Sequence, residues 1–143
     1  MCNIVRVIIA DDHALVRQSM LWLLAQEPQI QIIAEAAEGR QALLLVEQLQ
    51  PDVVVLDTVM PGLDGIRAAH QIRKAGYKTR VLMVSIHETY YLARLALKHG
   101  AHGYVAKSTM YQDLARAIIA VAQGEPFVSD PIREAPVGES LCL

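Results

Sequence analysis

Five short apolar runs, separated by stretches of helical periodicity, limit what this 143-residue chain can fold into. The runs are Ile4–Ala10, Ile30–Ala34, Val53–Leu56, Val81–Val84 and His102–Ala106. Between the first two, Val16, Met20 and Leu24 recur at the spacing that places side chains on one face of a helix. Regular alternation of strand and helix predicts an α/β fold, in which helices cover both faces of a parallel sheet.

Prolines and glycines mark the ends of the expected helices. A helix tends to end before a proline, and a left-handed cap favours glycine. Two prolines follow the first two helical stretches and three glycines follow the others: Pro28, Pro51, Gly76, Gly100 and Gly124. Thr109 and Gln112 form a capping-box pattern that predicts the start of the last helix. We therefore expect a doubly wound, five-stranded parallel sheet of order 2-1-3-4-5, the flavodoxin-like (βα)5 arrangement.

Composition excludes several classes of protein. The net charge of −2 provides no basic footprint, so direct nucleic-acid binding by this chain is not expected. Cys2 and Cys142 stand at opposite ends, which fits a reducing compartment and excludes a cysteine-held metal site. No apolar run approaches the roughly 20 residues needed to cross a bilayer, and none resembles a signal peptide. We expect a cytoplasmic chain without a membrane span.

The regular pattern ends near Glu125. We expect one domain over residues 1–125, and a linker or ordered arm over residues 126–143, where prolines and a glycine fall among charges without periodicity. This tail is too short to hold a helix-turn-helix, so no DNA-binding domain is expected within the chain.

Asp57 stands at the C-terminal end of the apolar run Val53–Leu56. Such a run suits a central strand that is buried on both faces. In open α/β sheets the ligand crevice lies just outside the carboxyl ends of the strands. The sequence therefore predicts that Asp57 faces a pocket.

Four other polar residues also follow expected strands: Asp11, Asp12, Ser85 and Lys107. Three carboxylates in one place repel each other and call for a cation, and oxygen ligands of this kind suit Mg²⁺. A hydroxyl and an ammonium suit the oxygens of a transferred phosphoryl group, a reaction that needs mainly positioning and charge neutralisation. Each residue alone also fits an ordinary role, such as a helix cap, a turn or a solvated lysine. Their shared position at strand ends favours the functional interpretation.

These residues carry a family resemblance. Ala10–His13, Leu56–Gly65, Ser85 and Gly103–Lys107 together resemble a response-regulator receiver domain, in particular the subfamily that precedes a helix-turn-helix DNA-binding domain in two-component transcription factors. The resemblance extends from about Ile4 to about Ser129.

The resemblance implies a role for each residue of the pocket. Asp57 would be the phosphoacceptor. Asp12 and Asp57 would bind Mg²⁺ directly, together with the Val59 backbone carbonyl and a water held by Asp11.

The resemblance also implies a set of switch residues. Lys107 would pair with the phosphoryl group, Ser85 would move to hydrogen-bond it, and Tyr104 would turn inward when Ser85 moves. Taken alone, Tyr104 equally fits a half-buried strand tyrosine with its hydroxyl in water.

Three neighbouring residues are expected to tune the chemistry. Ile86 is bulkier than the small residue that many receivers have there, and we expect it to narrow access to Asp57. Val59 and His87 occupy positions that line the path of the hydrolytic water. Because Val59 offers that water no polar contact, we expect a long-lived phosphorylated form. The other histidines show no metal-ligand spacing and are expected to be solvated.

The expected function is a phosphorylation switch and not an enzyme. A sensor histidine kinase would be the phosphodonor, and the output would be dimerisation or the release of a missing or separate DNA-binding domain that controls transcription. The main alternative is a pseudo-receiver that docks proteins independently of phosphorylation. An aspartyl-nucleophile phosphatase needs a second acid at the position of Val59, and a dinucleotide-binding domain needs a GxGxxG motif that is absent here.

Overall fold

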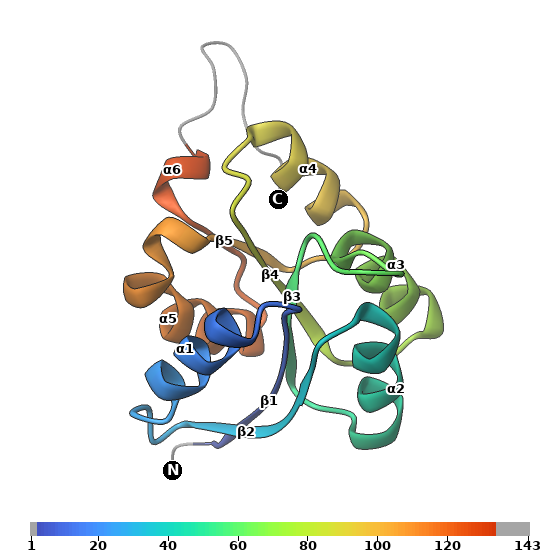
Figure 1. The fold of residues 1–143 in the computed structure, drawn as a ribbon, viewed down its shortest axis with the longest axis vertical. Helices are drawn as coiled ribbons and strands as arrows, with labels where there is room; N and C mark the ends of the chain where they lie inside the picture. The colour runs from blue at the N-terminus through green and yellow to red at the C-terminus, as the bar shows by residue number, and fades with distance from the viewer. Residues whose placement is uncertain (1–2, 134–143) are drawn as a thin grey trace.

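A parallel sheet with helices on both faces organises the chain (Figure 1), which a computed structural model describes over residues 3–133. The sheet has the order β2-β1-β3-β4-β5-β6. Its strands are β1 (Val5–Ala10), β2 (Ile30–Ala36), β3 (Val53–Asp57), β4 (Arg80–Ser85), β5 (Gly103–Ala106) and β6 (Phe127–Val128). The expected class and the expected order of the first five strands are confirmed.

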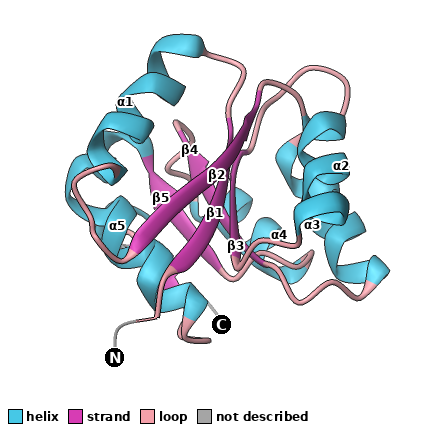
Figure 2. Cartoon of the chain, turned by 90° about the horizontal axis from the view of Figure 1, so that it is seen from below, coloured by secondary structure: helices cyan, strands magenta, loops and turns pink. Residues whose placement is uncertain are grey.

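The helices form two layers, one on each face of the sheet (Figure 2). On one face lie α1 (Ala14–Leu24) and α5 (Met110–Ala122). The other face is covered by α2 (Gly39–Leu49), α3 (Gly65–Ala75) and α4 (Tyr90–Lys98). A 3-10 turn, η1 (Lys107–Thr109), precedes α5, and a short helix, α6 (Asp130–Arg133), follows β6.

Strand β3 is buried along its whole length, as its run of valines predicts. Every residue from Val53 to Asp57 is buried, because β3 is paired on both edges, with β1 and β4, and covered on both faces. Val54 and Leu56 pack with the α2–α4 layer, whereas Val53 and Val55 pack with the α1–α5 layer. This alternation determines the face of the sheet toward which the Asp57 side chain points at the end of the strand.

The sixth strand was not expected from the sequence. After the turn at Gly124, β6 pairs in parallel with β5, so that Phe127 lies opposite Gly103 and Val128 opposite Tyr104. Two residues are too few to show a strand period, and Pro126 just before them reads as a loop. Ile132 in α6 is buried in the core cluster that contains Tyr104. The sheet therefore continues beyond residue 125, while residues 134–143 of the expected tail lie outside the described part of the chain.

Helix ends confirm the glycine predictions and correct one cap. Gly76, Gly100 and Gly124 all have positive φ. Helix α5 begins directly after Thr109, as predicted, but the capping box itself is wrong: Thr109 has φ −116° and its hydroxyl accepts no capping hydrogen bond from a backbone N–H of α5. Its hydroxyl instead donates to Asp113 Oδ2 at 2.7 Å. The cause is η1, which brings the chain into α5 without the extended residue that an N-cap requires.

Within residues 3–133, no helix has both the length and the apolar character that crossing a bilayer requires.

Candidate functional site

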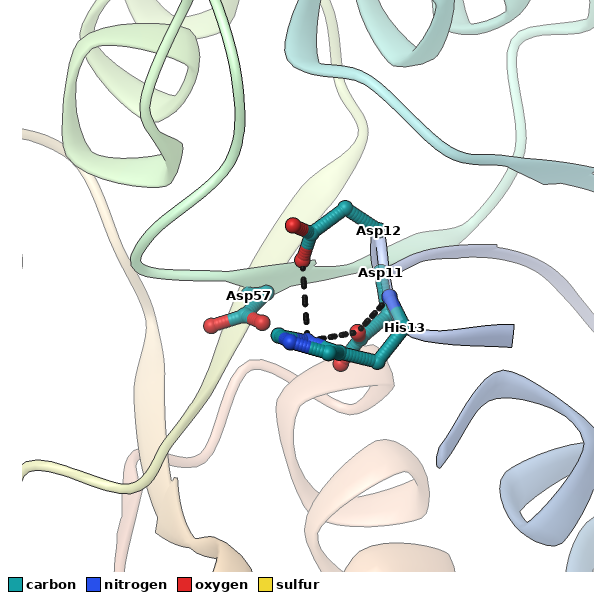
Figure 3. A group of neighbouring side chains, drawn as sticks. All are labelled: Asp11, Asp12, His13 and Asp57. Carbon is teal, nitrogen blue, oxygen red and sulfur yellow. Dashed lines mark hydrogen bonds and ion pairs between the residues drawn. The ribbon is translucent and has the colours of Figure 1, made fainter. Parts of the chain in front are cut away.

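The carboxyl ends of β1 and β3 place three acids together (Figure 3). Ala10 at the end of β1 lies opposite Leu56 in β3, so Asp11 and Asp12 follow one strand beside the point where Asp57 ends the other. Asp11 and Asp57 are buried, and Asp12 is partly exposed. One ligand atom from each of Asp11, Asp12, His13 and Asp57 lies within 4.8 Å of the others. The predicted convergence of the three acids is confirmed.

Lys107 bridges two of these acids. Its Nζ lies 2.9 Å from Asp57 Oδ2 and 3.0 Å from Asp11 Oδ2. The ammonium reaches the pocket because Lys107 follows β5 at the same edge of the sheet. One ammonium among three carboxylates leaves an excess of negative charge, so the pocket favours a further cation.

The electrostatics of the pocket follow from burial and from this pairing. Burial raises the pKa of Asp57 above its ordinary value, with a further contribution from the Asp11 charge, although hydrogen bonds from Lys107 and from the Val59 backbone N–H act in the opposite direction. Burial acts to lower the pKa of Lys107, but its hydrogen bonds to Asp57 and Asp11 outweigh burial and raise it. The ammonium is therefore held in its charged form beside Asp57.

The oxygens of the pocket fit a hard divalent cation. Asp11 Oδ2 and Asp12 Oδ1 are buried, and within the described residues their polar contacts are ion-pair contacts: Asp11 Oδ2 lies 3.0 Å from Lys107 Nζ, and Asp12 Oδ1 lies 3.1 Å from His13 Nδ1. Buried carboxylate oxygens with so few partners are costly unless a cation or water satisfies them further. Mg²⁺ takes oxygen ligands, commonly one or two carboxylates together with waters and phosphate oxygens. The donor set of Asp11, Asp12 and Asp57 matches that chemistry.

His13 belongs to this cluster, which sequence reasoning missed. Its Nδ1 lies 3.1 Å from Asp12 Oδ1 and 3.5 Å from Asp11 Oδ1, and its backbone N–H donates to Asp11 Oδ1 at 2.8 Å. The ring itself is exposed, as expected for a solvated histidine. Its place directly after two acids at a strand end was the signal that could have identified it.

Ser85 is buried at the end of β4, next to β3, and its hydroxyl is already engaged. Ser85 Oγ lies 2.7 Å from Thr58 Oγ1 and accepts a hydrogen bond from the His87 backbone N–H at 3.0 Å. Thr58, also buried, was not identified from the sequence, although a hydroxyl directly after Asp57 was a usable signal. The structure thus shows Ser85 bound to its neighbours and not to Asp57.

Tyr104 is turned into the protein. Its side chain is fully buried, and its hydroxyl donates to the His87 backbone carbonyl at 2.9 Å. Burial raises the pKa of the Tyr104 phenol. The alternative of a strand tyrosine with its hydroxyl in water is therefore wrong. The His87 backbone links Ser85 to Tyr104 through one hydrogen bond on each side.

Two of the expected tuning residues expose their side chains beside the pocket. Val59 is 57% exposed and Ile86 is 69% exposed. The Val59 backbone N–H donates to Asp57 Oδ1 at 3.2 Å, which ties this loop to the pocket. The effects of Val59, Ile86 and the His87 side chain on access and hydrolysis stay predictions.

One other histidine differs from expectation. His102 is half-buried, and its Nδ1 accepts a hydrogen bond from the Val81 backbone N–H at 3.0 Å. Burial, together with the charges of Arg80 and Arg73, lowers the pKa of His102. This imidazole is a structural acceptor at the start of β5 and not a solvated side chain.

Comparisons with known proteins place this pocket in a family. The family model of the response regulator receiver domain matches residues 7–119. The probable transcriptional regulatory protein NarL of Mycobacterium tuberculosis is 33% identical over 135 residues, which cover 94% of this chain and 62% of that protein. The transcriptional regulatory protein DegU of Brevibacillus brevis is 34% identical over 126 residues, covering 88% of this chain and 53% of that protein.

Solved structures of response regulators have the same fold as this chain. The signal receiver domain of the putative response regulator NarL from M. tuberculosis superposes with a TM-score of 0.83 at 34% identity, covering 86% of this chain and 99% of that one. A LuxR-family two-component response regulator from Aurantimonas sp. gives a TM-score of 0.87 at 35% identity, covering 91% of this chain and 93% of that one. The chain spans 62% of the length of the NarL relative and thus corresponds to its receiver part. With the acids of β1 and β3 and the lysine after β5 in one pocket, the chain belongs to the response-regulator receiver-domain family.

Proposed function

We propose that this receiver domain accepts a phosphoryl group on Asp57 and uses it as a conformational switch. The observation that carries the proposal is the Lys107 ammonium, which bridges Asp57 and Asp11 in a pocket that also holds the carboxylate of Asp12. A nucleophilic carboxylate, a fixed positive charge and a cation site are the parts that phosphoryl transfer requires.

The transfer forms an acyl phosphate. A carboxylate oxygen of Asp57 attacks the phosphorus of a phosphohistidine on a sensor kinase. The P–N bond breaks, and its electron pair returns to the imidazole of the kinase. Lys107 holds Asp57 in place and neutralises charge on the incoming group. Asp11, Asp12, Asp57 and the Val59 backbone carbonyl are the groups that would hold Mg²⁺, which would supply further charge neutralisation when bound.

The new charge then competes for the hydrogen bonds of Ser85. In the described structure this hydroxyl is bound to Thr58 and to the His87 backbone. A phosphoryl oxygen is a stronger acceptor and draws the hydroxyl toward Asp57. The loop that contains His87 would follow, and with it the carbonyl that holds Tyr104. The phosphoryl state thereby biases the position of α4, which begins three residues after His87.

In this proposal, the part of the protein that responds to phosphorylation is a domain separate from the described residues. The NarL and DegU relatives are named as transcriptional regulatory proteins and are longer than this chain. We infer that a sensor kinase phosphorylates the domain and that a DNA-binding domain, separate from the described residues, responds. A phosphatase role is disfavoured, because the position two residues after Asp57 is the apolar Val59 and offers no acid to a leaving group.

Phosphorylation in vitro tests the proposal. The purified chain is incubated with acetyl phosphate and Mg²⁺, and the product is followed by intact mass and by phosphate-affinity electrophoresis. We expect a base-labile phosphoryl group that requires Mg²⁺ and is lost in Asp57→Asn. Asp64→Asn is the matched control, because Asp64 caps α3 through its Oδ1 and asparagine preserves that cap.

The main alternative has a distinct outcome in the same experiment. If neither acetyl phosphate nor a phosphorylated histidine kinase labels the folded chain, the domain is a docking module that works without phosphorylation.

A further inference from the structure

Charge is segregated along this chain in a way that its net charge conceals. Residues 65–106 contain seven of the 13 Lys and Arg residues but only one of the 15 Asp and Glu residues, Glu88. The fold gathers this segment around α3 and α4, which lie side by side on one face of the sheet (Figure 1). Neither helix contains an acid. The net charge of −2 is therefore the sum of +6 over residues 65–106 (7 basic, 1 acidic) and −8 over the rest of the chain (6 basic, 14 acidic).

Grooves run along both sides of α4. The groove between α3 and α4 has a volume of about 710 Å³, and no acid lines it. The residues that matter for its chemistry are Ile66, Arg67, His70, Lys74, Leu95 and His99. A second groove of about 790 Å³ lies on the other side of α4 and shares Leu95 with the first; its lining includes Arg94 and Lys98 and one acid, Glu125.

Among the basic side chains of these two grooves, α4 exposes two large side chains. Tyr91 is 76% exposed and Leu95 is 43% exposed, and they are four residues apart on the same face of α4. Large exposed apolar side chains rimmed by charge are typical of interaction sites.

Two contacts join α3 to α4 at this groove. Arg73 from α3 donates to the Lys98 carbonyl in α4 at 3.1 Å. The rings of His70 and His99 meet edge to face, with centroids 5.6 Å apart. Because these contacts join the two helices, a partner would meet a preformed groove and pay little for ordering it.

We propose that the α3–α4 groove binds an acidic amphipathic helix of a partner protein. Leucine-type side chains of that helix would pack on Leu95 and Ile66, and its carboxylates would pair with Arg67 and Lys74. This is helix-in-groove recognition combined with selection by basic side chains. The apolar side chains of Ile66 and Leu95 in the lining favour a protein segment over the sugar-phosphate backbone of a nucleic acid. The proposal is independent of Asp57 and goes beyond phosphoryl transfer.

A designed helical peptide tests the proposal. The probe is a fluorescein-labelled amphipathic helix with leucines at i, i+4 and i+7 and glutamates on the flanking positions. Binding to the full chain is measured by fluorescence anisotropy and mapped by amide chemical shifts. We expect the largest changes in amide chemical shift on α3 and α4. Lys74→Glu should weaken the affinity for the peptide about tenfold, and Leu95→Ala should weaken it about fivefold.

Matched controls separate the outcomes. Arg40→Glu makes the same charge change on exposed α2 and should leave the affinity within about twofold, since it lies outside the groove. The proposal is overturned by no binding, by equal weakening in Arg40→Glu, or by equal binding of a peptide whose leucines are replaced by serine. Tighter binding of a labelled random DNA duplex to the same residues would also overturn it, in favour of a nucleic-acid surface. Circular dichroism verifies that each variant is folded.

Discussion

Ser129 ties the unexpected sixth strand to the part of the sheet that carries Lys107. It is 1% exposed, and its hydroxyl accepts a hydrogen bond from the Ala106 backbone N–H at 3.0 Å. The same hydroxyl donates to Asp113 Oδ2 in α5 at 2.9 Å. Its own backbone N–H donates to the Tyr104 carbonyl at 3.0 Å. Ser129 thus joins β5, α5 and the C-terminal segment.

Replacing Ser129 with alanine should destabilise the domain by about 2 kcal/mol. The buried Ala106 N–H would lose its acceptor, and a buried donor without a partner costs roughly 1–3 kcal/mol. Asp113 would lose one donor but would keep the Thr109 hydroxyl and the Arg116 guanidinium, so its contribution is smaller. The backbone bond to Tyr104 needs no side chain and should survive.

Urea unfolding measures this change in the free energy of unfolding. Ser19→Ala is the control, because Ser19 is partly exposed and its hydroxyl donates to the Leu15 carbonyl within α1; its effect should stay within about 0.5 kcal/mol. A Ser129→Ala variant as stable as the wild type would refute the reasoning, since β6 would then not depend on this hydroxyl.

Two further predictions concern hydrolysis and pH. Val59→Asn should shorten the lifetime of the aspartyl phosphate, because an amide next to the pocket can orient the hydrolytic water; an unchanged decay rate by phosphate-affinity electrophoresis would contradict this. Burial, assisted by Arg80 and Arg73, lowers the pKa of His102 below its ordinary value of 6.5, so the unfolded chain binds a proton more readily than the folded one. The contribution of His102 to stability is therefore present above about pH 6.5 and is lost as the pH falls through the lower folded-state pKa. The Val81 N–H then loses its acceptor. Between pH 8 and pH 5.5, the urea midpoint of unfolding should fall further in the wild type than in His102→Gln. An equal fall in both proteins would count against a role of His102 in this pH dependence.

Much of the pocket was predictable because its signals are local. A run such as Val53–Leu56 is a strand by its own composition, and the residue that follows such a strand lies at the carboxyl edge of any parallel sheet. Asp11, Asp12, Asp57 and Lys107 could thus be placed together without knowledge of any distance. The alternation of strands and helices predicted the parallel sheet, and the order of the first five strands is the one usual for this doubly wound class.

Other features depend on partners that are distant in sequence. The Thr58–Ser85 pair joins residues 27 positions apart, and the inward position of Tyr104 depends on a carbonyl 17 residues away. No local period reports such contacts. The two-residue β6 shows the same limit, since its only evidence is pairing with β5 and the burial of Val128.

The sequence by itself determined the class of fold, the sheet edge at which the acids and the lysine gather, and the chemistry that those groups suit. Only the tertiary structure decided that Lys107 bridges Asp57 and Asp11, that Ser85 is bound to Thr58, and that α3 and α4 present a basic face. The physical reason is that composition and periodicity are sums over neighbours along the chain. Hydrogen bonds and charged surfaces depend instead on which distant residues the packing of the sheet and its helices brings within a few ångströms.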